Sequence, residues 1–446
     1  MVLNCKPFSR SKMMKKFLLA AAVPAMFFFA VGASAQSLQS SFFLDNYTYS
    51  YQLNPASMTE DMNGFFGLGI DNINIGANSN LGLGSVLFPM TIDGQKTLVT
   101  GLHPDVDADT FLNKLDDRNV IDLNANLNIL SFGIARNSSL FTFELNLRSE
   151  IGTDVPKDAF ALLKLGGTRD DRYTLKDISL NTTNYVEAVA GYSKSLNGNW
   201  RLGGRLHLIA GIADASVIVP KADVDVKGDF AVDATGSVNI YAGKYQLPSN
   251  ADGYVDIDNI SFDPHELGLG GFGAALDLGA EYRSDSWILS ASVLDLGGVF
   301  WKDGMVAEAN YSGIVDSKNV DADALLKIVD KADDKFIGLG PRVNAGVRYQ
   351  ILPSLSAGVL GTVRTGRYGW SEARAGLTYT PGHFFSIAAT GGANTYGPCF
   401  GAAMNFNIAF LNLYLGTDAI MTSFSPQLIP INKMHTRLNA GLVINL

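Results

Sequence analysis

Histidine and serine, the residues that most often carry catalysis or bind metals, are not spaced for either use in this chain. The five histidines stand far apart in the sequence, with neither an HExxH motif nor a paired spacing typical of a metal site. G-x-S-x-G and P-loop motifs are also absent. The glycine-rich stretch 268–273 lacks the strand before it and the helix after it that a phosphate-binding loop needs. We therefore expect no enzyme, no cofactor and no metal site.

Two acidic clusters, at 105–117 and 321–334, could offer oxygen ligands to calcium. Neither has the glycine and the terminal glutamate of an EF-hand loop. We interpret them as solvated loop faces. The stretch from Ala322 to Ala332 has apolar residues at helical spacing, which predicts a short amphipathic helix in an external loop.

Charged residues also occupy alternate positions inside otherwise apolar segments. Around 141–148, for example, apolar and polar residues alternate, which is the period of a strand with two unlike faces. The charged residues assigned to the polar faces are Glu144, Arg148, Glu187, Arg205, His207, Asp277, Glu281, Arg283, Arg342, Arg348, Glu372 and Arg374. They could form a charged constriction or a substrate path. Because both signs occur in similar number, we favour a network of paired charges that fills an interior.

The hairpin 271–298 shows which elements position these charges. Its first arm alternates strictly, and each arm has about ten residues, the length that a tilted strand needs to cross a bilayer. The same reading predicts about 14 strands. They lie near 67–78, 120–135, 139–150, 183–195, 200–213, 271–283, 286–297, 340–350, 354–365, 368–380, 383–391, 396–409, 411–418 and 436–446.

The connections between these strands alternate in length. Tight turns join the second strand to the third, the fourth to the fifth, the sixth to the seventh, the eighth to the ninth and the tenth to the eleventh. Long links lie near 79–119, 151–182, 214–270, 298–339 and 419–435. All long links fall at the end opposite the tight turns, provided that 214–270 adds no strand or an even number. This predicts an all-β fold, a transmembrane antiparallel up-and-down β-barrel with short periplasmic turns and long extracellular excursions.

Four tyrosines support the same fold. Tyr192, Tyr282, Tyr349 and Tyr379 each stand on the apolar face of a strand, one to three residues before a tight turn. A tyrosine at this height keeps its ring in the acyl region and its hydroxyl among headgroups. We predict that the four form a periplasmic aromatic girdle.

The N-terminus carries an export signal. A basic region precedes the apolar run from Phe17 to Gly32, and Ala33-Ser34-Ala35 is a small-residue cleavage site, so residues 1–35 are predicted to be a signal peptide. Its removal lowers the 34 Lys and Arg by five to 29, against 43 Asp and Glu, which gives a net charge of −14. Nucleic acid is therefore an improbable partner. Only Cys399 remains after cleavage, so no intrachain disulfide is expected.

Two short segments carry a family resemblance. Leu53-Asn54-Pro55-Ala56, soon after the signal peptide and before a Gly-rich strand, and the strand ending 289–297 resemble the FadL-type (long-chain fatty acid transporter) barrels and the porin-V-like barrels associated with type IX secretion. The resemblance implies a barrel of 14 strands, formed by residues 67–446. It also implies that residues 36–66 fold into this barrel as an N-terminal plug, with Asn54, Pro55 and Ala56 as the plug motif. The link 214–270 is longer than the resemblance implies.

Two functions remain open. The first is passive or facilitated uptake of a hydrophobic or amphiphilic small molecule across the outer membrane of a Gram-negative bacterium. The second is a non-transporting outer-membrane anchor or secretion accessory that presents long surface loops to a protein partner. Lipid is the expected surrounding in both, and an outer-membrane phospholipase, whose site residues need not be sequential, is a weaker third reading.

Overall fold

The computed structural model describes residues 38–57, 63–92, 94–165, 172–196, 198–226, 231–243, 247–256, 259, 268–314, 327–329, 333–419 and 433–446. The predicted signal peptide lies outside the described residues. Within them, no helix is long and apolar enough to cross a membrane.

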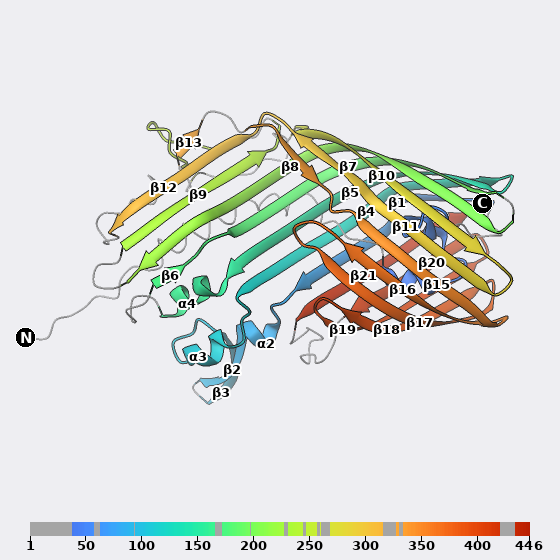
Figure 1. Ribbon diagram of the computed structural model, residues 1–446, viewed down its shortest axis with the longest axis horizontal. Coiled ribbons are helices and arrows are strands. Elements are labelled where there is room, and N and C mark those ends of the chain that lie inside the picture. Colours follow the sequence, from blue (N-terminus) through green and yellow to red (C-terminus); the bar gives the residue numbers. More distant parts are fainter. Residues whose placement is uncertain are drawn as a thin grey trace, which may run out of the picture.

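The described strands form a closed antiparallel barrel of 14 strands, which confirms the predicted fold class (Figure 1). Each strand of the ring pairs with the next along the barrel, and β21 closes on β1 through pairs such as Ile75 with Leu438. The strands of the ring are β1 (Gly64–Ser79), β4 (Arg118–Arg136), β5 (Ser139–Pro156), β7 (Ile178–Ser195), β8 (Trp200–Asp225), β10 (Gly271–Arg283), β11 (Trp287–Trp301), β15 (Arg342–Leu352), β16 (Leu355–Arg364), β17 (Trp370–Gly382), β18 (Phe385–Asn394), β19 (Gly397–Ile408), β20 (Leu411–Ala419) and β21 (Met434–Asn445).

Apolar side chains cover the outer face of the ring. Leu208, Leu278, Val359, Leu377 and Leu442 are each about half exposed, while the residues beside them in sequence point inward and are buried or half-buried. Exposed leucine and valine around a closed ring have no protein partner to cover them, so this face meets lipid.

The strands on one side of the barrel continue far beyond it. β8 has 26 residues, which at roughly 3.3 Å per residue is about 85 Å, much longer than a bilayer crossing. β8 pairs with β10 up to Gly211, and from Asp214 onward it pairs with β9 (Ala231–Tyr241) instead. β12 (Met305–Ile314) and the short β13 (Lys327–Val329) extend the same sheet. We call this extension of β4, β5, β7 and β8, together with β9, β12 and β13, the wall (Figure 1).

The wall shows what the long links contain. The described residues of the link 214–270 add no strand to the barrel, so the alternation of connections holds there. However, β9 and the outer half of β8 are strands where a surface loop was expected. The predicted helix over 322–332 is wrong at Lys327–Val329, which form β13; the rest of it lies outside the described residues. Cross-strand pairing with β12 imposes an extended backbone there, and this pairing overrides the local helical spacing.

Short elements lie at the same end of the barrel as the wall. They are α2 (Leu83–Val86), β2 (Leu87–Ile92), β3 (Gln95–Thr100), α3 (Ala108–Leu112), α4 (Lys157–Leu165) and β6 (Arg172–Thr174), with β14 (Lys335–Gly338) paired to β11. Phe88 and Phe111 form the core of this cap. Asp107 caps α3 by accepting a hydrogen bond from the Thr110 amide at 2.8 Å, and this bond lowers the pKa of the Asp107 carboxyl.

The N-terminal segment 38–57, which we call the plug, lies inside the barrel. It consists of two 3-10 turns, η1 (Gln39–Phe43) and η2 (Thr48–Gln52), and most of its residues are fully buried. Tyr47, Tyr49 and Tyr51 pack with Phe65 and Tyr414 of the barrel in one apolar cluster. The plug occupies the half of the lumen nearest the tight turns, and the wall rises from the other end (Figure 1).

Candidate functional site in the barrel lumen

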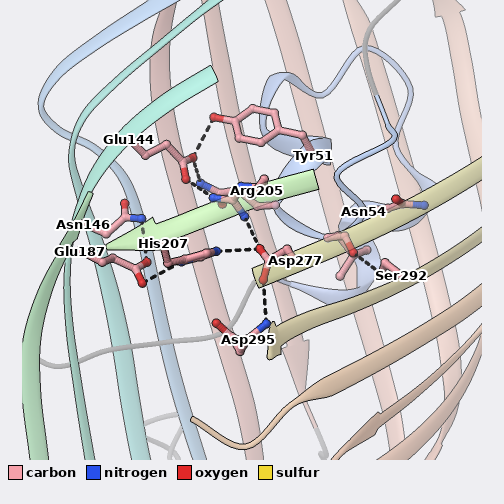
Figure 2. Close-up of polar contacts among 12 residues, drawn as sticks. Tyr51, Asn54, Glu144, Asn146, Glu187, Arg205, His207, Asp277, Ser292 and Asp295 are labelled. Atoms are coloured by element: carbon pink, nitrogen blue, oxygen red, sulfur yellow. Dashed lines mark hydrogen bonds and ion pairs between the residues drawn. The ribbon is translucent and has the colours of Figure 1, made fainter. Parts of the chain in front are cut away.

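One cluster of polar contacts between the plug and the barrel is centred on Glu144 of β5. Its carboxylate accepts a hydrogen bond from the Tyr51 hydroxyl at 2.8 Å and another from the Gln52 side-chain amide at 2.6 Å. Arg205 of β8 forms an ion pair with the same carboxylate (Figure 2). Because strand alternation points both Glu144 and Arg205 inward, the two charges meet where the plug passes them.

A chain of ion pairs continues from Arg205 around the lumen. Arg205 Nη1 lies 3.1 Å from Asp277 Oδ2 of β10. The ring of His207 lies between Asp277 and Glu187, at 2.9 Å from a carboxylate oxygen on each side (Figure 2). A histidine can donate from both nitrogens only as the imidazolium cation, so His207 serves as a positive link in this network. Neither nitrogen is free to act as a base toward a nucleophile.

A β-bulge in β11 adds a further acidic residue to the network. The register between β10 and β11 shifts at Asp277, and Asp295 adopts a left-handed φ of 59°. Its amide donates to Asp277 Oδ1 at 2.7 Å, and its carboxylate lies 2.8 Å from Arg148 Nη1. Arg148 also pairs with Glu187 at 3.0 Å. The bulge thus redirects Asp295 into the lumen, as bulges next to functional sites often do.

The motif Asn54-Pro55-Ala56 fits into a notch made by two glycines. Gly203 of β8 and Gly279 of β10 are cross-strand partners. A Cβ added to Gly203 would overlap the Pro55 carbonyl, and one added to Gly279 would overlap the Asn54 side chain. Asn54 Nδ2 also donates to the Ser290 hydroxyl at 2.7 Å. The motif is therefore held by close backbone approach as well as by hydrogen bonds.

The first half of the plug is held on the opposite side of the barrel. The amide of Gln39 donates to Asp418 of β20 at 2.7 Å, and the Ser40 hydroxyl lies 2.7 Å from that of Thr390. Asp45 pairs with Arg348 of β15. Each of these bonds involves a side chain. Within the described chain, the backbone–backbone hydrogen bonds of residues 38–57 all stay inside the plug.

Two adjoining cavities lie between the plug and the outer end of the barrel. The inner cavity, about 40 Å³, is lined by Gln52 of the plug and by charged barrel residues that include Arg148 and Arg342. The outer cavity, about 180 Å³, is lined in part by Lys335 and by the link between β16 and β17. Both cavities contact Glu150, Tyr185, Leu339 and Arg364, so they adjoin. Together they form a vestibule above the plug, with a mainly polar lining in the inner cavity and a mainly apolar one in the outer cavity.

The lumen-facing candidates all belong to these networks or to the plug contacts, apart from Arg342. Glu281 accepts from the Ser57 hydroxyl at 2.8 Å and pairs with Arg283, which lies at the rim and is half-buried. Glu372 and Arg374 form a second cluster with Asp418. Apart from Arg342, these side chains therefore pair with one another or with the plug.

Sequence reasoning missed several residues of the same sites. Arg364 pairs with Glu150 at 2.8 Å and with Asp122 at 3.6 Å. Extending the polar-face assignment to the outer ends of the strands would have found it. Arg437, which alternation assigns to the polar face of the last strand, stacks over Trp370 at 4.1 Å, a contact that the sequence did not indicate. The redirection of Asp295 by a bulge left no such signal.

The four tyrosines stand at the tight-turn end, on the outer face. Three of them contact an aromatic ring on the neighbouring strand: Tyr192 with Phe141, Tyr282 with Trp200 and Tyr349 with Trp287, with centroids 4.6–5.1 Å apart. Tyr379 is half exposed. The two tryptophans, each at the start of a strand after a tight turn, were missed by sequence reasoning, although their position next to the turns could have indicated them.

Metal binding finds no support in the geometry. Among the described residues, no group of three or more His, Cys, Asp and Glu side chains is arranged to hold a metal ion. The carboxylates of the lumen face arginines and His207, which are cations, so a bound metal would compete with them. Chemically, the lumen offers charge-assisted hydrogen bonding.

Comparison with known proteins identifies a family. A family model described as "Family of unknown function (DUF5723)" matches residues 55–418, most of the chain. The chain belongs to this family. No curated protein sequence matches it.

Solved structures with a similar fold include transport proteins. The toluene transporter TodX of Pseudomonas putida is 10% identical, with 93% of this chain and 98% of that chain covered and a TM-score of 0.47. The toluene transporter TbuX of Ralstonia pickettii is 7% identical, with 93% and 95% covered and a TM-score of 0.46. A FadL homologue of Pseudomonas aeruginosa is 12% identical, with 93% and 97% covered and a TM-score of 0.46. Identities this low and TM-scores below 0.5 carry no functional argument, so the function proposed below rests on the geometry of this chain.

Proposed function

We propose that the protein resides in the outer membrane of a Gram-negative bacterium, reached through a cleaved signal peptide, and mediates uptake of a hydrophobic or amphiphilic small molecule. The observation that carries this proposal is the way the plug is held. It fills the half of the lumen nearest the tight turns, yet its hydrogen bonds to the barrel strands all involve a side chain, and no backbone ladder joins it to them among the described residues. A segment held in this way can shift by breaking side-chain contacts while the barrel stays intact.

The vestibule supports a direction of entry. A molecule that arrives at the outer end would meet the 180 Å³ cavity first, then the 40 Å³ cavity, and then Gln52 of the plug. The cavities are lined by many charged side chains, which favours an amphiphilic molecule over a wholly apolar one. The plug motif Asn54-Pro55-Ala56 would then have to leave its glycine notch to open a path.

The first test removes the plug. A variant without residues 38–57, reconstituted in liposomes, should release trapped carboxyfluorescein, while the wild-type barrel retains it. The dye is polar and does not cross lipid unaided, so its release reports an open lumen. Liposomes with the deletion variant that retain the dye as well as the wild type does would show that the plug is not the barrier.

The second test fixes the plug in place. The Ser40 and Thr390 hydroxyls lie 2.7 Å apart, so S40C with T390C, in a C399S background, places two thiols within reach of a disulfide. Cells that produce the oxidised variant should lose uptake of radiolabelled dodecanol and dodecanoate, and a reducing agent should restore it. T390C with C399S alone is the control. Uptake that is equal in the oxidised and reduced states would contradict a moving plug.

A specific observation favours a second candidate function. The wall rises beyond the membrane as a sheet of β8, β9 and β12, far larger than a loop that merely connects barrel strands. We propose, as the alternative, that the barrel anchors this sheet for a secretion or surface protein partner. Cross-linking in intact cells should then recover one partner with the wild type and lose it when β9 and β12 are replaced by short linkers. If the variant without β9 and β12 lost uptake but gave the same cross-linked species as the wild type, the result would favour transport.

A further inference from the structure

Arg342 differs from the other arginines that line the inner cavity. It is the first residue of β15, its side chain is 4% exposed, and its cross-strand partner on β16 is another arginine, Arg364. Like charges directly opposite each other on one face of a sheet repel. Both guanidinium groups line the 40 Å³ cavity above the plug.

The neighbouring arginines are each balanced by carboxylates. Arg364 pairs with Glu150 and Asp122, Arg148 with Glu187 and Asp295, and Arg205 with Glu144 and Asp277. Arg342 has no such partner: within the described part of the chain, its Nε and Nη1 atoms are buried without a hydrogen bond, and it forms no ion pair. A guanidinium cannot lose its proton in a protein, so this positive charge stays in the lumen.

The acidic residues nearest to Arg342 are already engaged. Leu294 is its partner in the register with β11, and the next residue, Asp295, directs its carboxylate to Arg148. Asp277 accepts from Arg205 and His207. The carboxylates that line the cavity, those of Glu144, Glu150, Asp277 and Asp295, thus pair with other cations and leave Arg342 unbalanced. Burial of an unbalanced charge is costly unless a ligand supplies the opposite charge.

The cavity has the size that such a ligand needs. A volume of about 40 Å³ holds roughly three water molecules, since one needs about 10–15 Å³ by the same measure. A carboxylate or a phosphate group has a similar size. Two oxygens of such a group match the fork of a guanidinium, and this bidentate contact is the geometry in which arginine recognises oxyanions.

We propose that Arg342 binds an oxyanion, a carboxylate, phosphate or sulfate group, in the inner cavity directly above Gln52 of the plug. The group belongs either to a small free anion or to the head of an anionic amphiphile. This inference goes beyond the proposed uptake function, because it concerns binding and holds whether or not the barrel transports anything.

The test measures stabilisation of the purified full-length barrel in a non-ionic detergent. The thermal unfolding midpoint is followed at constant ionic strength, with sodium chloride as reference, while acetate, phosphate, sulfate or octanoate replaces chloride. Octanol is the uncharged match for octanoate. A ligand that binds only the folded protein raises the midpoint as its concentration passes the dissociation constant. The variants are R342Q and, as a matched charge control, R136Q at the exposed last residue of β4, outside the lumen.

We expect an oxyanion to raise the midpoint of the wild type and of R136Q, and R342Q to bind at least about tenfold more weakly because it loses a charge-assisted bidentate contact. Stabilisation by acetate, phosphate or sulfate assigns the site to a free anion. If octanoate stabilises the protein while octanol and the small anions do not, the site binds the head group of an anionic amphiphile. No stabilisation by any anion, or equal stabilisation of R342Q, overturns the proposal.

A second readout separates binding from a purely structural role. Without added oxyanion, R342Q should unfold at the same temperature as the wild type or higher, since it removes an unbalanced buried charge. A lower midpoint for R342Q in chloride would mean that Arg342 already has a stabilising partner within the protein, which would also overturn the proposal.

Discussion

At the residue scale, the absence of two side chains decides where the plug motif lies. Gly203 and Gly279 face each other across β8 and β10. The Pro55 carbonyl and the Asn54 side chain occupy the space where their Cβ atoms would be. Glycine in a strand interior usually weakens the strand, and it is retained where another backbone approaches closely. The notch is thus a site for the plug and not a defect of the sheet.

This notch gives a prediction with a control one residue away. G203A should displace the plug, because the Cβ would meet the Pro55 carbonyl, a backbone atom that cannot turn aside. In G204A the new Cβ would meet only ordinary contacts, at 3.5 Å or more, on the other face of the strand. Chymotrypsin should therefore cleave at the buried plug tyrosines in G203A and spare them in G204A.

Equal protection of the plug in both variants would contradict the notch. Mass spectrometry of the fragments identifies the cleavage position, so cutting in the external links can be distinguished from cutting at Tyr47, Tyr49 or Tyr51.

At the element scale, β1 carries an irregularity in the middle of its membrane crossing. Five residues of β1, 67–71, lie opposite only two residues of β21, Leu442 and Val443. On the other side of β1, the three residues 69–71 lie opposite the single residue Ile129 of β4. Gly69 has a φ of +87°, the left-handed region that other residues rarely enter. The extra residues turn the Asp71 side chain inward, where it accepts from the Ser131 hydroxyl at 2.5 Å.

The bulge predicts a backbone cost at Gly69. G69A should lower the free energy of unfolding by about 1–2 kcal/mol, because a Cβ is strained in the left-handed conformation although the space around it is open. The control is G361A, also on the outer face, where φ is not positive and the nearest heavy atom is 3.8 Å away. Urea titrations of the folded fraction should show a lower midpoint for G69A only. Equal midpoints would mean that the bulge relaxes without strain.

At the scale of the whole molecule, closure of the ring determines whether the barrel exists. β21 pairs with both β20 and β1, and the Leu446 amide donates to the Gly64 carbonyl at 2.9 Å. An open sheet edge in lipid would leave a row of backbone groups without partners, at several kcal/mol for each group. The last strand is therefore indispensable to the barrel.

Heat-modifiable migration on a gel measures this closure. The wild-type protein should run as a compact band that shifts on boiling. Removal of residues 434–446 should abolish the compact band, since β20 and β1 would each lose a partner. Removal of the β2–β3 hairpin, residues 87–100, is the control and should preserve it, because that hairpin is a separate two-stranded sheet outside the ring. A heat-shifted compact band for the truncated chain would contradict closure by β21.

The sequence by itself determined the local features of this protein. The 14 strands, the tight turns between them and the inward face of Glu144, Arg205 or Arg342 follow from alternation with period two, because a strand sends successive side chains to opposite faces wherever it lies. The tertiary structure alone decided the rest. β9 and β12 gain their conformation from pairing in the wall, Asp295 is redirected by a bulge, and Arg148 meets Asp295 across 147 residues of chain. Which buried charge is balanced depends on strand register and on where the plug lies. That is why the sequence could predict a network of paired charges but not that Arg342 would be left without a partner.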